Sequence, residues 1–388
     1  MAKLQKASKI LAILLIIVLI IGYCILRFIV WPRVDADMNP VSAHKPFKIS
    51  ERARALHDQL WIADLHADNL LWRRDPRKRH GFGHVDLPRL AEGGVELQVF
   101  SAVTKSPKGL NFDKNSAEAP DQITTLAQAQ LWPPKTWGSI YERAVYQAKR
   151  LQILERQGHV HIIRTSRDLE KTDRLLGLLL TEGAHPLEGK IENIAWLKIE
   201  GYRAMGLQHF FDNELGGSMH GLSQAGLTAF GRKAVLEMRQ QGIIIDVAHS
   251  SREVVKDVLA ITSDPIFISH GGTIFHCPHT SNRNLPDDIL KEIANRGGII
   301  GIGYFNGVIC DISPDGIADA IIDAISLLGE DAVSLGSDFD GTVTTSLDTS
   351  ELAVITQALL DRGVKAKTIK KVMGENARRF LKENLPSE

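Results

Sequence analysis

The sequence contains few cysteines and no excess of charge of either sign. Its 388 residues include three cysteines and no CxxC pair, so a thiolate metal site is not expected. Lysine and arginine together number 46, as do aspartate and glutamate, whereas a nucleic-acid-binding protein would show a basic excess. Internal repeats and low-complexity segments are also lacking. Hydrophobic residues make up 44 %, enough for a large core, and the length suits two domains or one α/β barrel.

The N-terminus is strongly apolar. Residues 10–26 form an uncharged run of 17 residues, long enough to span a membrane as a helix. Lysines precede the run and Trp31 follows it, so the positive-inside rule predicts a cytoplasmic N-terminus and a body on the exported (periplasmic or extracellular) side. A cleaved signal peptide is the alternative, but no small-residue cleavage site follows the run. Cys24 does not suit a lipoprotein site, because Tyr23 precedes it.

The chain is therefore expected to have three parts. Residues 1–31 form a single-pass membrane anchor, residues 32–55 a polar tether containing prolines, and residues 56–388 the folded domain. Cys277 and Cys310 could pair in an oxidising compartment, but the sequence alone does not decide this.

Short apolar runs alternate with helical patterns in the folded domain. Gly242 is expected to end one helix, Ser250 and Glu253 have capping-box spacing, and Pro286 precedes an acidic first turn. Eight strands alternating with helices predict a (β/α)8 TIM-type barrel. Residues 101–140 contain four prolines and are expected to form a long excursion after the second strand. The expected strands are 60–64, 95–100, 177–181, 205–209, 243–248, 265–269, 298–303 and 332–337.

Polar side chains follow six of these strands at their carboxyl ends. In a barrel these ends meet at one mouth, where active sites form. Taken singly, each residue has a structural explanation, such as a helix cap, a turn or a buried histidine. Their recurrence at the same end of successive strands favours a shared site. The residues are His66 and Asp68, one residue apart and so on one side of an extended chain, then Glu182, His209, His249, His270 and Asp338.

Histidine nitrogens and carboxylate oxygens are the ligands of zinc and similar divalent ions. Five candidate ligands, His66, Asp68, Glu182, His249 and His270, exceed what one catalytic zinc uses. They suit two ions that share a bridging carboxylate.

Two positions have a nearby competitor of the same type. Glu200 also precedes a glycine, but it lies in a segment that reads as helix, whereas Glu182 closes an apolar run. Asp340 follows Asp338 by two residues, but Asp338 is nearer the strand end.

The chain from about residue 55 onward resembles the membrane dipeptidase (renal dipeptidase) family of the amidohydrolase superfamily. The motifs that carry the resemblance are DLHADNL, LLLTEGAHPLEG, LQHFFDN, GLTAFGRKAVLEM, IIDVAHSS, ISHGG, RNLPDD and GSDFDG. It implies a (β/α)8 barrel in which two zinc ions and a metal-bridging hydroxide hydrolyse the peptide bond of dipeptides.

The resemblance also implies a role for each site residue. His66 and Asp68 would bind the first ion, Glu182 would bridge, and His249 and His270 would bind the second. The remaining positions would act on the substrate: His209 would contact it and the transition state, Arg283 would hold its free carboxylate, and Asp338 would transfer protons.

The segments FFDNELGGSMHG and GYFNGVIC depart from the family pattern, which leaves the preferred side chains and stereochemistry open. Two other functions remain as alternatives: a different amidohydrolase reaction, such as lactam or lactone opening, and a non-catalytic membrane-anchored binding protein. The sequence also leaves open whether the chain forms a homodimer.

Overall fold

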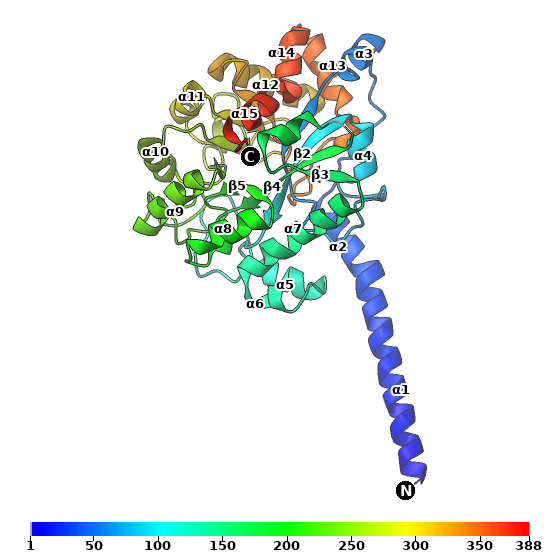
Figure 1. Ribbon diagram of the computed structural model, residues 1–388. Helices are drawn as coiled ribbons and strands as arrows, with labels where there is room; N and C mark the ends of the chain where they lie inside the picture. The colour runs from blue at the N-terminus through cyan, green and yellow to red at the C-terminus, as the bar shows by residue number, and fades with distance from the viewer. Residues whose placement is uncertain (1, 172, 388) are drawn as a thin grey trace.

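A long N-terminal helix projects from the folded body of the computed structural model, which describes residues 2–171 and 173–387 (Figure 1). It comprises α1 (Ala2–Ile25), the π-helical segment η1 (Leu26–Val30) and α2 (Trp31–Met38). The stretch Gln5–Met38 is 34 residues long, with a mean hydropathy of 3.0 in its most apolar window, and that window contacts nothing else in the protein. At 1.5 Å per residue it extends roughly 50 Å, so it is long and apolar enough to cross a membrane.

Eight parallel strands close into a barrel. Neighbouring strands pair in the order β2-β1-β9-β8-β7-β6-β5-β4, and β2 also pairs with β4, which completes the ring. The predicted (β/α)8 TIM-type barrel is confirmed. The ring consists of β1 (Ile62–Ala67), β2 (Val95–Val103), β4 (Leu175–Glu182), β5 (Tyr202–Gly206), β6 (Ile244–Asp246), β7 (Phe267–Gly271), β8 (Ile299–Ile302) and β9 (Val333–Leu335).

A ninth strand, β3 (Val160–Ile162), was not predicted. It pairs with the first residues of β4, and its three residues are too few to show an alternating pattern. The fourth barrel strand was placed too late at 205–209. Gly201 has φ of +107°, which ends the preceding helix early, and β5 begins at Tyr202.

Helices surround the barrel (Figure 1). Gly242 ends α9 in a left-handed conformation as expected (φ +70°). The cap of α10 is Ser251 rather than Ser250, because the Ser251 hydroxyl accepts the N–H of Val254. The helices are α3 (Glu51–His57), α4 (Leu87–Glu92), α5 (Gln122–Ala129), α6 (Lys135–Gly138), α7 (Ile140–Arg156), α8 (Glu192–Ile199), α9 (Ala229–Gln240), α10 (Arg252–Ile261), α11 (Asp287–Asn295), α12 (Pro314–Leu328), α13 (Ala353–Asp361), α14 (Ala366–Lys370) and α15 (Asn376–Asn384), with single turns η2 (Ser166–Glu170), η3 (His185–Leu187), η4 (Pro278–Thr280), η5 (Thr349–Glu351) and η6 (Lys371–Glu375).

The barrel interior is filled by apolar side chains below the site. On β4, Leu176, Leu178 and Leu180 belong to the interior cluster, and the next residue in this alternation is Glu182. On β1, Leu65 belongs to the same cluster, and the pairing with β2 is irregular between Asp64 and Ala67, the stretch that contains Leu65 and His66. The apolar layers thus end where the polar site begins, and the strands themselves place its side chains.

Candidate active site

The predicted site residues other than His66 line one cavity at the carboxyl ends of the barrel strands, and His66 is buried against Glu182. The volume of the cavity is about 90 Å³. Polar groups occupy its floor, whereas much of its wall is apolar. The lining includes Asp68, Glu182, His209, His249, His270, Arg283 and Asp338 together with Leu71, Val103, Leu110, Phe112, Ile123, Phe210, Phe305 and Val343.

The Glu182 carboxylate lies at the centre of this group. Its Oε1 is 3.1 Å from Nε2 of His249, 3.5 Å from Nε2 of His66 and 3.6 Å from Nε2 of His270. Its Oε2 is 3.4 Å from Nε2 of His209. One carboxylate therefore faces ring nitrogens from four different strand ends, three of them near Oε1 and one near Oε2. Glu200, by contrast, caps the end of α8 and lies outside the cavity.

A single hydroxyl fixes the tautomers of two histidines. Ser269 donates its hydroxyl proton to Asp246 (2.6 Å) and accepts from Nδ1 of His66 (3.0 Å) and Nδ1 of His270 (2.9 Å). Because both Nδ1 atoms then carry the proton, both Nε2 atoms in the neutral rings present a lone pair to the cavity. This is the outer-shell arrangement typical of metal-binding histidines. Sequence reasoning missed Ser269 and Asp246, although each is part of a polar interruption in an apolar strand.

The donor atoms fit a divalent cation. Ligand atoms of His66, Asp68 and Glu182 lie within 4.8 Å of one another, and so do those of Glu182, His209 and His249. Nε2 of His249 and Nε2 of His270 are only 3.0 Å apart. The buried Nε2 of His66 and Oδ1 of Asp68 lie 3.4 Å apart, and neither atom makes a well-aligned hydrogen bond with any described residue. Buried polar atoms are rarely left without a hydrogen bond, so these two atoms favour a bound cation at this position.

The electrostatics also favour a cation. Burial raises the pKa of Glu182 well above its usual value, and the Asp68 charge raises it further. Burial likewise raises the pKa of Asp338, and the negative charges of Asp68 and Glu182 raise it further. Burial lowers the pKa of His249 and His270 well below normal, with Arg283 contributing, which keeps these rings neutral as ligands must be.

Asp338 and its competitor Asp340 point to different surroundings. Oδ1 of Asp338 lies 4.0 Å from Nε2 of His66, and the residue lines the cavity. Asp340 turns away: its carboxylate accepts the backbone N–H groups of His84 and Val85 and pairs with Arg74. The two aspartates therefore do not compete for one role.

Arg283 is buried beside the cluster, and its hydrogen bonds use only part of its guanidinium group. Its Nη1 donates to the carbonyl of Ala248 at 3.0 Å and its Nη2 to that of His270 at 3.4 Å. Its buried Nε has no partner among the described residues. Burial lowers the Arg283 pKa from its ordinary value, but Asp338 and Glu182 oppose that shift.

His209 is anchored through its other ring nitrogen. Nδ1 lies 3.0 Å from the carbonyl of Lys105, which can only accept, so Nδ1 carries a proton. In the neutral ring Nε2 is then unprotonated. Burial lowers the pKa of His209 to about 4.

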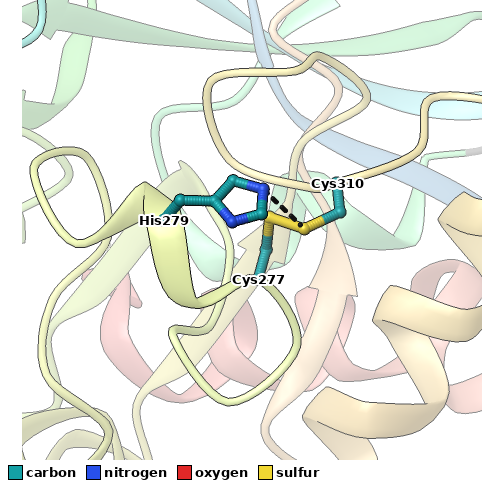
Figure 2. Close-up of side chains that lie close together, drawn as sticks. All are labelled: Cys277, His279 and Cys310. Atoms are coloured by element: carbon teal, nitrogen blue, oxygen red, sulfur yellow. Dashed lines mark hydrogen bonds between the residues drawn. A yellow bond between two sulfur atoms is a disulfide. The ribbon is translucent and has the colours of Figure 1, made fainter.

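A disulfide joins the loops that follow β7 and β8 at the edge of the site. Cys277 and Cys310 are bonded, which answers the question that the sequence left open. Figure 2 shows His279 beside them, with Nε2 3.3 Å from Sγ of Cys310. Although these three side chains cluster, the sulfurs bind each other and are not thiolates, so the oxidised chain offers no second metal site here.

The closed parallel barrel, with a buried histidine–carboxylate cluster at its mouth, has the arrangement of an enzyme active site. Residues 50–386 match the model of the membrane dipeptidase family (peptidase family M19), and the chain belongs to that family. It is thus a peptide hydrolase of the dipeptidase kind.

Curated relatives agree with this assignment, and a solved structure shares the fold. The chain is 34 % identical over 345 residues to dipeptidase aclJ of Aspergillus oryzae, covering 82 % of this chain and 77 % of that protein. It is 27 % identical over 314 residues to dipeptidase tcpJ of Claviceps purpurea, covering 78 % and 69 %. The fold matches a Rhodobacter sphaeroides metallopeptidase liganded with a phosphinate mimic of L-Ala-D-Ala, with TM-score 0.67, 24 % identity and coverage of 84 % and 99 %.

Proposed function

We propose that this protein hydrolyses the peptide bond of dipeptides with two zinc or similar divalent ions. The observation that carries the proposal is the Glu182 carboxylate, which faces the Nε2 atoms of four histidines. His66 and Asp68 would hold one ion, His249 and His270 the other, and Glu182 both. When bound, the ions would supply a water molecule of lowered pKa as the nucleophile.

The chain's own polar groups account for substrate binding and proton transfer. Arg283 would pair with the free carboxylate of the dipeptide and so select substrates of fixed length. Asp338 would take a proton from the attacking water and deliver it to the leaving amine. His209 would contact the substrate. For His209 to donate a hydrogen bond to the developing oxyanion, Nε2 must gain a proton, because Nδ1 is held by Lys105.

The cavity wall supports a preference for apolar substrate side chains. Leu71, Val103, Phe112, Ile123 and Phe305 line it, and the charged lining residues are confined to the cluster and Arg283. A charged substrate side chain would lose its hydration without a compensating partner. A panel of L,L-, L,D- and D,D-dipeptides with apolar, acidic and basic side chains tests this by comparing kcat/KM.

We further propose that the N-terminal helix is a single-pass anchor, with a cytoplasmic N-terminus and an exported catalytic body. The disulfide supports this orientation, since such bonds persist in oxidising compartments.

The decisive experiment replaces Glu182 and, as the matched control, Glu200. Glu182→Gln removes the charge that would join two ions, so bound metal should fall from about two equivalents and dipeptide hydrolysis should be lost. Glu200→Gln should leave both unchanged, because Glu200 is a helix cap outside the cavity. Full activity of the wild-type protein with one ion or none would refute the binuclear proposal.

A further inference from the structure

The segment that follows the candidate membrane helix is built into the folded body. Residues 32–38, expected to begin a polar tether, continue the helix as α2. Two polar side chains of this stretch are almost fully buried, Asp35 at 4 % exposure and Asn39 at 0 %. Burial of such groups is costly unless they are paired, so their partners define what the segment does.

Asp35 joins a buried ion network that reaches the end of β9. Nε of Arg74 lies 2.9 Å from Asp35, and Nη2 of the same arginine lies 2.6 Å from Asp340. The side chains of Arg74 and Asp340 are 6 % and 0 % exposed. The indole N–H of Trp72 donates to the carbonyl of Asp340 at 2.7 Å. Arg74 thus links the juxtamembrane helix to the residue two positions after Asp338.

Asn39 extends this link to the backbone of the cavity wall. Its Nδ2 donates to Oδ1 of Asp35 (3.0 Å), and its Oδ1 accepts the N–H of Thr342 (3.0 Å). Thr342 has φ of +61°, a left-handed conformation that a threonine rarely adopts. Gly341, Thr342 and Val343 all line the catalytic cavity. The Asn39 side chain, which comes from outside the barrel, therefore holds a strained stretch of the cavity wall in place.

Backbone pairing completes the attachment. Ser42 donates its N–H to the carbonyl of Thr345 (2.8 Å), and Thr345 donates its own to the carbonyl of Pro40 (3.2 Å). Nε2 of His84 lies 3.3 Å from the same Pro40 carbonyl. Residues 39–42 are consequently bonded directly to Thr342 and Thr345, and Asp35 is linked to Asp340 through Arg74.

We propose that residues 31–42 form a juxtamembrane strap that positions the rim loop, residues 338–345, with Asn39 as its principal positioning residue. The strap fixes the wall of the cavity and the backbone that carries Asp338. It also fixes the cavity mouth relative to the membrane helix, because α2 continues that helix without a break. The expected effect of the strap on hydrolysis rests on the proposed dipeptidase function, whereas its effect on the conformation of the rim loop does not.

The test uses the full-length protein in detergent and measures amide hydrogen exchange in the rim loop alongside dipeptide hydrolysis. Asn39→Ala leaves the Thr342 N–H without its acceptor. Exchange in residues 338–345 should accelerate at least about tenfold, kcat/KM should fall about tenfold, and bound metal should be unchanged. Asp37→Asn is the control, since Asp37 is exposed on the same helix and, within residues 2–171 and 173–387, has an ion pair only with exposed Arg33; this variant should match wild type.

A charge swap separates positioning from general damage to the fold. Asn39→Asp alone sets two carboxylates side by side and should loosen the rim loop as Asn39→Ala does. Adding Asp35→Asn restores one amide facing one carboxylate but also removes the charge that pairs with Arg74, so this double variant should recover slow exchange and activity only in part. Wild-type exchange in Asn39→Ala, or no recovery in the double variant, would overturn the strap. Absence of dipeptidase activity in the wild type would refute the proposed function while the exchange measurements still decide the strap.

Discussion

At the scale of single residues, the backbone conformation decides which of two nearby aspartates, Asp338 or Asp340, faces the cavity. Asp338 and Asp340 both have left-handed backbones, with φ of 61° and 63°, yet one lines the cavity and the other is sequestered by Arg74. The Asp338 carboxylate, which faces the cavity, is therefore the one proposed for proton transfer, whereas the Asp340 carboxylate is held by Arg74.

This difference predicts opposite effects for two matched variants. Asp338→Asn should retain metal and slow turnover by roughly 10²–10⁴-fold, the usual contribution of general acid–base catalysis. Asp340→Asn should chiefly lower the melting temperature, because it weakens a buried ion network. Metal content, kcat and melting should be measured on the same preparations. Metal loss in Asp338→Asn would instead make Asp338 a ligand.

Arg283 supplies the next residue-scale prediction. Arg283→Lys keeps the charge but loses the planar fork that pairs with a carboxylate. Transition-state binding of dipeptides should weaken by about 1–3 kcal/mol, with the metals retained. Dipeptide amides, which lack the carboxylate, provide the comparison, since their hydrolysis should change little. An unchanged kcat/KM for dipeptides would place the carboxylate elsewhere.

At the scale of elements, strands that are not all adjacent in the barrel cooperate in orienting the candidate metal-binding histidines. Asp246 at the end of β6 orients Ser269 on β7, which in turn orients His66 of β1 and His270 of β7. Residues of three strands thus determine which ring nitrogen of His66 and His270 faces Glu182. The orientation of these rings therefore depends on the strand register that brings Ser269 to them.

Removing that hydroxyl should weaken metal binding without removing a ligand. Ser269→Ala frees both Nδ1 atoms, and zinc affinity should fall roughly 10–100-fold, the usual cost of losing an outer-shell partner. Ser334→Ala is a suitable control, because Ser334 is equally buried on β9 and its hydroxyl has no partner among the described residues. Competition with a chelator measures the affinities; equal values for the two variants would remove Ser269 from the metal site.

At the scale of the whole molecule, orientation across the membrane decides where the reaction occurs. The three lysines before the apolar run of residues 10–26 predict a cytoplasmic N-terminus. Protease added to sealed cells or spheroplasts should therefore digest the catalytic body, and detergent should not be needed. A cytoplasmic protein of the same cells serves as the control. Protection of the body until detergent is added would reverse the proposed orientation.

The sequence indicated most of the barrel, since long apolar runs separated by capped helices predict alternating strands and helices. The predictions from the sequence were wrong at elements whose local sequence pattern is weak. β3 is three residues long, and β5 was displaced because the helix before it ends at a glycine whose conformation the sequence does not reveal. The cap of α10 was misplaced by one residue because both candidate positions are serine.

The sequence by itself determined the kinds of ligand and their positions at strand ends, because a strand's polar terminus is a local property. Only the tertiary structure decided which atoms face one another. The Ser269 hydroxyl links residues more than 200 positions apart, and Asn39 reaches a backbone N–H 303 positions away. The pairing of Cys277 with Cys310 was likewise decided in space. Such contacts depend on how the chain closes on itself, and the chemical identity of a residue does not specify its distant partner.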